Sequence, residues 1–143
     1  MDRMTENDAA RGRRLEDFLG VWRLDRQISH GDGTEARFVG RAEWRRAPGG
    51  ALCHESGTLS LPDGTAFQAE RRYFWDTALR VHFEDGRFFH AVPPQGGVAA
   101  HDCPPDRYAA RYAFDAWPEW RCTWRVSGPR KDYVMRGRYR QGA

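Results

Sequence analysis

One carboxylate, one guanidinium, one phenol and one imidazole along the chain could form a single polar site, and these are Glu55, Arg71, Tyr73 and His90. A carboxylate and a guanidinium form a charged hydrogen-bonded pair, and the guanidinium keeps further donors for a ligand carboxylate, phosphate or carbonyl group. A phenol and an imidazole add one neutral and one titratable hydrogen-bonding group. Together these groups could hold the polar end of a ligand or perform acid–base chemistry, provided that the fold brings them to one place.

The pattern of residues after position 20 predicts an all-β protein. Short stretches of alternating apolar and polar residues are separated by turn sequences such as LPDG, EDGR and SGPRK. Alternation with a period of two is typical of strands with one buried face. We expect a single closed antiparallel up-and-down barrel of about ten strands, because closure removes exposed sheet edges. A β-sandwich of the same strands is the alternative.

The residues before these strands predict a tail and a short helix. Residues 1–12 are polar and lack the apolar segment of a signal peptide, so we expect a flexible tail and a cytoplasmic protein with no membrane span. The segment RRLEDFLG carries Leu15, Phe18 and Leu19 on one helical face, which predicts a short helix that plugs one barrel end. Residues 13–143 then form one barrel domain with a core of its own.

Turn geometry decides which residues of a hairpin lie opposite each other. A turn at Pro62–Gly64 would place Glu55 opposite Arg71 and Cys53 opposite Tyr73. Both pairs belong to the apolar face of their strands. We therefore expect the acid and the base to point into the barrel and to satisfy each other.

A second hairpin decides the direction of His90. Asp85-Gly86 favours a two-residue type I′ turn, which would pair Phe83 with Phe88 and Val81 with His90. Residues directly opposite share a face, and this face is the apolar one. His90 is therefore expected to point inward with the core.

Other hairpins are expected to supply aromatic walls. A turn at Asp76–Ala78 would place Tyr73 across from Val81, and a later hairpin would pair Tyr112 with Cys122 and Ala110 with Trp124. Trp22 joins the same face from the first strand. The expected ligand-binding residues are Arg71, His90, Glu55, Tyr73, Trp22, Tyr112 and Trp124.

This set predicts the binding of a small apolar or aromatic molecule with a polar or anionic end inside the barrel. Arg71 and His90 would hold that end, and Glu55 would orient Arg71. One alternative is a small enzyme with His90 as the acid–base group beside Glu55 or Tyr73, and another is haem or metal binding through His90 or His101. A buried ion pair that only sets the register is the structural alternative. We expect no resident cofactor or metal, and we favour a binding protein over an enzyme.

Two further segments leave their roles open. In AHDCPPDRY, His101 and Cys103 alternate and Asp106 follows a Pro-Pro turn, which is a weak metal-site pattern. In the turn from Gly128 to Tyr133, Lys131 and Asp132 are expected to form a salt bridge, although this turn could also meet an anion at the barrel mouth. The free thiols expected of a reducing compartment are Cys53, Cys103 and Cys122.

The charge pattern bears on macromolecular partners. The chain has a formal net charge of +3 and a pI near 9.0, and its basic residues are 22 arginines and Lys131. Because the arginines are scattered among acids, we expect solvated strands rather than a nucleic-acid partner. The alternative is a basic outer surface that contacts RNA or a protein partner. The outward stripe comprises Arg121, Arg125, Arg136, Arg138 and Arg140. A homodimer is left open.

Two sets of motifs resemble known barrels. FLGVWRL resembles the Gly-x-Trp opening of lipocalins and fatty-acid-binding proteins, which implies that Trp22 lies at the closed end beneath a basic residue such as Arg138 or Arg140. The chain as a whole resembles an uncharacterised bacterial family of calycin-like barrels through GVWRLDRQI, HESG, ERRYFW, FEDGRFFH, AHDCPPDRY and GPRKDY. That resemblance implies the fold and no particular activity.

Overall fold

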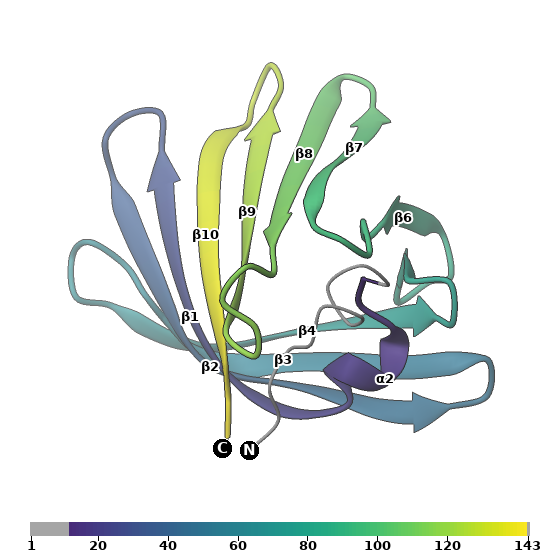
Figure 1. Cartoon of the computed structure of the whole chain (residues 1–143). Helices are drawn as coiled ribbons and strands as arrows, with labels where there is room; N and C mark the ends of the chain where they lie inside the picture. Colours follow the sequence, from purple (N-terminus) through teal and green to yellow (C-terminus); the bar gives the residue numbers. More distant parts are fainter. Residues whose placement is uncertain (1–11, 143) are drawn as a thin grey trace.

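The computed structural model shows one antiparallel sheet that curls into a nearly closed barrel (Figure 1). It describes residues 12–142, apart from the side chains of residues 102 and 103. The predicted tail therefore lies, except for its last residue, outside the described residues. One short helix precedes ten strands, which confirms the predicted fold class.

The elements follow one another with short turns. They are α2 (Leu15–Phe18), β1 (Gly20–His30), β2 (Glu35–Ala47), β3 (Gly50–Ser60), β4 (Ala66–Asp76), β5 (Arg80–Phe83), β6 (Phe88–Ala91), β7 (Gly97–Cys103), β8 (Asp106–Ala113), β9 (Trp120–Ser127) and β10 (Asp132–Gln141).

The strand order is that of a meander whose first and last strands meet. Along the sheet it runs β6-β5-β4-β3-β2-β1-β10-β9-β8-β7, so β1 pairs with both β2 and β10. The two ends of this order are β6 and β7, which follow each other in the chain and flank the seam of the barrel. Every other strand has a partner on each side, as barrel closure requires.

One end of the barrel is filled by aromatic side chains around α2. Phe18 is 0% exposed, and its ring contacts five others. Those five are Trp44, Trp75, Phe114, Trp117 and Trp120. Trp22 donates a hydrogen bond of 2.8 Å from its indole N–H to the carbonyl of Phe18, which ties β1 to the helix. We call this end the aromatic plug.

The basic residue at the aromatic plug differs from the expected one. Arg138 and Arg140 pair across β1 with Asp25 and Arg23, on the outer face, so neither lies over Trp22. The arginine that caps the plug is Arg13, whose guanidinium lies 4.7 Å from the centre of a Trp117 ring. Arg13 precedes α2 in the chain. The resemblance implied a basic residue from the last strand, and so it did not indicate Arg13.

Several predicted registers are confirmed. Strands β3 and β4 pair Glu55 with Arg71 and Cys53 with Tyr73. Strands β8 and β9 pair Tyr112 with Cys122 and Ala110 with Trp124. The connecting turns had been correctly located in these cases, so the faces followed.

The β4–β5 hairpin was predicted one residue too early. Trp75 pairs with Val81, and Tyr73 pairs with Phe83. The turn is centred later because the Asp76 carboxylate accepts the backbone N–H groups of residues 78 and 80, each at 2.9 Å. Leu79 adopts a left-handed backbone with φ of 60°, which completes this turn.

The β5–β6 hairpin contains two irregularities that cancel at His90. Its loop has three residues, since the Phe83 N–H donates to the Arg87 carbonyl at 2.8 Å, and a bulge follows in the ladder. The pairing of Val81 with His90 is therefore as predicted, but Phe83 does not pair with Phe88. Phe88 points outward and is 50% exposed, whereas Phe89 is buried beside His90.

Candidate ligand-binding cavity

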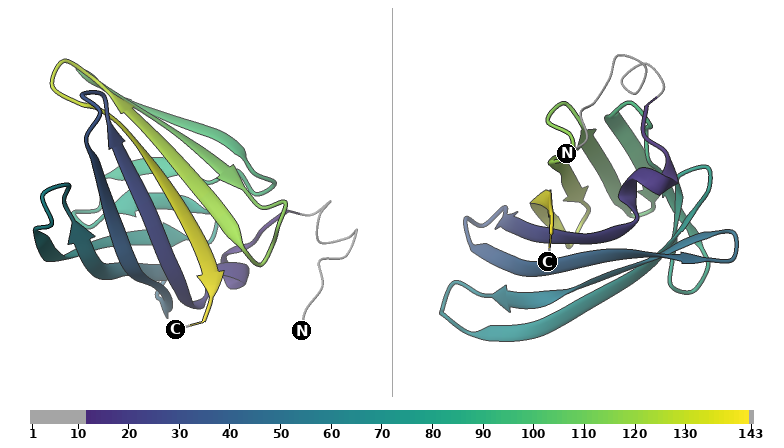
Figure 2. Two further views of the ribbon diagram at one scale, coloured as in Figure 1. Left: turned by 90° about the vertical axis from the view of Figure 1, so that its left-hand side faces the viewer. Right: turned by 60° about the horizontal axis from the view of Figure 1, so that its bottom comes forward.

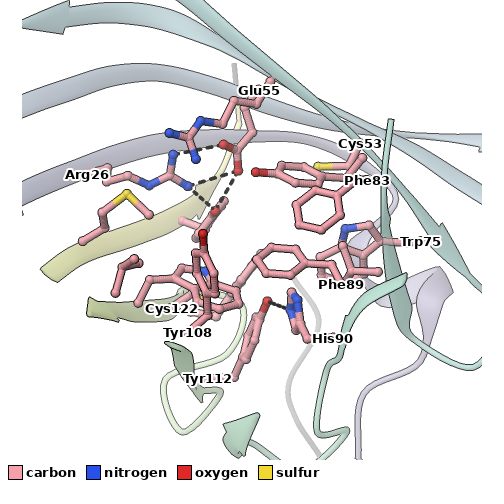
Figure 3. Close-up of a pocket in the computed structure, with 18 of the residues that line it drawn as sticks. Arg26, Cys53, Glu55, Trp75, Phe83, Phe89, His90, Tyr108, Tyr112 and Cys122 are labelled. Atoms are coloured by element: carbon pink, nitrogen blue, oxygen red, sulfur yellow. Dashed lines mark hydrogen bonds and ion pairs between the residues drawn. The ribbon is translucent and has the colours of Figure 1, made fainter. Parts of the chain in front are cut away.

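A cavity of about 220 Å³ lies inside the barrel next to the aromatic plug (Figure 3). Six of the seven predicted binding residues line it, namely Glu55, Arg71, Tyr73, His90, Tyr112 and Trp124. Trp22 does not line it, and its ring packs against Trp117 and Trp120 in the aromatic plug. Most of the other lining residues are aromatic or apolar, including Phe83, Phe89, Val81 and Met135.

A buried ion pair crosses one side of the cavity. Arg26 donates two hydrogen bonds to the two carboxylate oxygens of Glu55, at 3.0 and 3.1 Å. The Tyr139 hydroxyl donates to Glu55 at 3.0 Å and accepts from Arg26 at 3.0 Å. Burial alone would raise the pKa of Glu55, but the charge of Arg26 and these hydrogen bonds hold that pKa below its ordinary value. Glu55 is therefore an ionised and fully committed carboxylate.

This ion pair corrects the predicted partner of Glu55. Arg71 lies opposite Glu55 in the register, yet the carboxylate bonds to Arg26, two strands away. The Arg26 side chain reaches across the intervening strand β2, where Phe38 lies opposite Arg26 and Ala42 opposite Glu55. Its guanidinium is 5.8 Å from the centre of the Phe38 ring. Arg26 was detectable in the sequence, because it continues the inward alternation of Trp22 and Leu24 on β1.

Arg71 is left at the rim of the cavity. Its side chain is exposed, and it also borders a smaller cavity of about 80 Å³ beyond the Arg26–Glu55 pair. Burial raises the pKa of Tyr73, while the charge of Arg71 and its hydrogen bond to that phenol oppose the rise. Arg71 thus lies between the solvent and the cavity. Its charge acts on Glu55 only from a distance, because Glu55 pairs with Arg26.

His90 is buried among the aromatic rings. It is 3% exposed, and its Nε2 lies 2.8 Å from the hydroxyl of Tyr112. Its Nδ1 is buried and has no hydrogen-bond partner among the described residues. Burial, together with the nearby His101, lowers the pKa of His90 to about 3. The imidazole is therefore neutral near pH 7, so any contact that it makes with a ligand is a hydrogen bond between neutral groups.

Three stacked rings form the wall beside His90. Phe89 stacks on Phe83 with centres 4.4 Å apart and on Trp124 with centres 4.9 Å apart. The His90 ring meets Trp124 edge to face at 4.7 Å. Phe89 was missed from the sequence because the bulge that turns it inward breaks the alternation of β6.

Two thiols complete the apolar lining. Cys53 and Cys122 are free and buried. Burial raises the pKa of Cys122 to about 12, and it also raises that of Cys53. Both side chains are therefore neutral, and a neutral buried thiol behaves as a small apolar group rather than as a nucleophile. Cys103 lies outside the described side chains.

Asp106, from the segment with a weak metal-site pattern, takes part in an ion pair. Asp106 forms an ion pair with Lys131 at 3.2 Å, and Lys131 also donates to the Tyr108 hydroxyl at 3.1 Å. The predicted bridge from Lys131 to Asp132 is therefore wrong, and Asp132 pairs with Arg125 instead, at 3.4 Å. Within the described side chains, no three potential ligands gather into a metal site. Haem or metal binding through His90 or His101 stays a prediction.

Comparison with known families places the chain. The model of the Family of unknown function (DUF6314) matches residues 18–141. The chain belongs to DUF6314. The matched range covers all ten strands of this DUF6314 protein, from the last residue of α2 to the end of β10. The resemblance to an uncharacterised barrel family thus agrees with the match, while the bacterial origin that it implies stays a prediction.

One solved structure extends the comparison to the fold. An S-type phycobiliprotein lyase from Guillardia theta is similar to this DUF6314 chain with a TM-score of 0.56 and 11% sequence identity. The similarity covers 90% of this chain and 91% of that chain. At this identity the likeness concerns the fold alone. No curated protein matches the sequence. Among the described residues, no helix has the length and apolarity needed to cross a membrane.

Proposed function

We propose that the barrel binds a small aromatic or apolar molecule in the cavity beside His90. The rings of Phe83, Phe89 and Trp124 offer flat apolar contact surfaces for such a molecule. A dry apolar cavity of about 150 Å³ accommodates benzene, so the larger space here suits one ring or two fused rings. The structural neighbour is named a phycobiliprotein lyase, which supports the use of this barrel type to handle small molecules.

The unpartnered Nδ1 of His90 is the observation that carries the proposal. A buried polar atom without a hydrogen bond costs about 1–3 kcal/mol, and such atoms are rare in folded proteins. Nδ1 belongs to a residue that lines the cavity, where a ligand hydroxyl, amide or carbonyl could reach it. Because the imidazole is neutral, it suits a neutral polar group.

A second contact point follows from the charges. The charged lining residues are Arg26, Arg71 and Glu55, so the Arg26–Glu55 pair cancels and Arg71 leaves one positive charge. Glu55 and His90 lie on opposite sides of the cavity in Figure 3, and Arg71 is the cross-strand partner of Glu55. The ligand that fits these groups is a flat molecule with an anionic group toward Arg71 and a neutral polar group toward His90.

The same geometry favours binding over acid–base catalysis. Both carboxylate oxygens of Glu55 accept hydrogen bonds from Arg26, and one also accepts from Tyr139, so this carboxylate is already engaged within the protein. A histidine with a pKa of about 3 is a weak general base at neutral pH. Neither group offers the proton transfer that the enzymatic alternative requires.

Three probes test the proposal. They are 6-hydroxy-2-naphthoate, 2-naphthoate without the hydroxyl group, and 2-naphthol without the carboxylate, each titrated while tryptophan fluorescence is measured. We expect the first probe to bind tightest. Arg71→Met should weaken the binding of the two carboxylate probes about fivefold to tenfold and leave the binding of 2-naphthol unchanged.

The neighbouring Arg72→Met variant is the matched control, because Arg72 points to the outer face and pairs with Glu70. It should bind all three probes like the wild-type protein. Equal losses in both variants, or no binding of any probe, would contradict the proposal.

A further inference from the structure

A row of three arginines crosses the outer face of three neighbouring strands. Arg23 on β1 lies directly opposite Arg41 on β2 and Arg140 on β10. Like charges directly opposite in a sheet are destabilising. Of these three, only Arg41 has an acid within ion-pair distance in the described part of the chain, and that is Glu43 at 3.8 Å.

The arginines continue along the same side of the barrel. Strands β1, β10, β9 and β8 lie side by side there (Figure 2, left). We define the arginine face as eight outward arginines of β1, β2, β8, β9 and β10, namely Arg23, Arg41, Arg111, Arg121, Arg125, Arg136, Arg138 and Arg140. Glu119 forms ion pairs with both Arg138 and Arg121, at 3.0 and 3.6 Å, so one acid is shared by two arginines.

Three members of the arginine face are exposed and lack an ion pair. Within the described residues, no acidic side chain lies within 4.0 Å of Arg23, Arg111 or Arg136. The opposite wall of the barrel is different. Its outward arginines are matched locally, as Arg72 is with Glu70 and Arg80 with Asp76, each at 2.9 Å. On the outer surface of these strands the three exposed arginines without an ion pair thus share one wall, whereas Arg71 on β4 lines the cavity.

We propose that the arginine face binds the phosphate backbone of a nucleic acid. Guanidinium groups match phosphates with two parallel hydrogen bonds, and several in a row can follow a charged backbone. The other outward side chains are mostly small or polar, including Ser29, Thr123, Ser127 and Ala109, with Val134 among them. A protein interface favours a broad apolar centre, whereas the apolar residues at the described outward positions of β1, β8, β9 and β10 are only single valines and alanines.

The same surface predicts binding without sequence selectivity. No aromatic side chain is found at the described outward positions of β1, β8, β9 and β10, so unpaired bases have nothing on which to stack. Contacts limited to phosphates carry no sequence information. A duplex, whose phosphates are regularly spaced and whose bases are hidden, is the preferred form. This inference is independent of the cavity, which lies inside the barrel.

A charge-matched pair of variants tests the inference. The first variant is Arg23→Gln/Arg111→Gln/Arg136→Gln, and the control is Arg72→Gln/Arg80→Gln/Arg87→Gln, which removes the same charge from the opposite wall and its adjacent loop. Binding of a short labelled DNA duplex is followed by fluorescence anisotropy between about 50 and 200 mM salt. Vesicles of phosphatidylcholine and phosphatidylserine are the competing polyanion.

The wild-type protein should bind the duplex with a steep salt dependence. The first variant should bind about tenfold more weakly, with a salt slope lower by about three, because each phosphate contact contributes about one. The control should stay within about twofold of the wild type. Equal losses in both variants, no duplex binding at low salt, or binding to the vesicles alone would overturn the inference.

Discussion

The two halves of the barrel interior are both rich in aromatic rings, yet one is solid and the other is hollow. In the aromatic plug, Phe18 enters from α2 and contacts five rings with no exposed surface. In the other half, the rings of Phe89 and Trp124 stack along a wall and leave a cavity of about 220 Å³. The difference lies in the helix, because among the described residues the hollow half receives no segment equivalent to α2. Aromatic content alone therefore does not decide whether a barrel is filled.

The largest effect is expected at the centre of the plug. Phe18→Ala should lower the free energy of unfolding by about 3–5 kcal/mol, because it opens a cavity that the surrounding rings cannot fill. Urea denaturation measures this loss. Phe88→Ala is the matched control, since Phe88 is 50% exposed and should change stability by less than about 1 kcal/mol. Similar losses in the two variants would remove the contrast between plug and surface.

The next effect is expected at the ion pair beside the cavity. Glu55→Gln should cost about 3 kcal/mol, because it leaves the buried Arg26 guanidinium without a counter-charge. The double variant Arg26→Met/Glu55→Leu should regain most of this stability, since a well-packed apolar pair replaces the ions. Denaturation at neutral pH separates these outcomes. A single variant as stable as the wild type would mean that the pair is solvated rather than buried.

A smaller, pH-dependent effect is expected from His90. Its pKa is lowered to about 3 in the folded protein, against about 6.5 in the unfolded chain. Between these values only the unfolded chain binds the proton, so stability rises with pH. Going from about pH 7 to pH 5 should cost about 2 kcal/mol through this group. His90→Gln should remove that part of the pH dependence, and an unchanged slope would show that His90 titrates normally.

The smallest effect on stability is expected at the rim. Arg71→Met should change the free energy of unfolding by no more than about 0.5 kcal/mol, because Arg71 is exposed and Glu55 bonds to Arg26. Thermal unfolding with and without 6-hydroxy-2-naphthoate tests this directly. Stabilisation by the probe should be weaker in the variant. A large loss of intrinsic stability would instead assign Arg71 to the structural ion-pair network.

The sequence predicted the register of the β3–β4 hairpin, although it placed the β4–β5 hairpin one residue too early. The turn at Pro62–Gly64 set the pairing of Glu55 with Arg71, and both the pairing and the inward face of Glu55 are confirmed. The bulge that turns Phe89 inward was not predictable in this way. It belongs to the end strand β6, where an extra residue disturbs the ladder with β5 alone.

The ion pair shows a second limit of pairing rules. Register identifies the nearest cross-strand neighbour of Glu55, but an arginine side chain is long enough to reach an acid two strands away. Arg26 on β1 bonds to Glu55 on β3 across the intervening strand β2. Which arginine pairs with Glu55 depends on the curvature of the closed sheet. The alternation of residues along a single strand does not predict that curvature.

The most direct test of the ligand-binding account is the nitrogen NMR spectrum of the His90 side chain at neutral pH, with and without 6-hydroxy-2-naphthoate. Without the probe, His90 should show the two distinct nitrogen signals of a neutral ring, with no protonation near pH 6.5. Addition of the probe should shift the Nδ1 signal strongly. In Arg71→Met the same shift should require a higher concentration of the probe. A charged ring at neutral pH, or an Nδ1 signal that stays unchanged while the probe binds, would contradict the account.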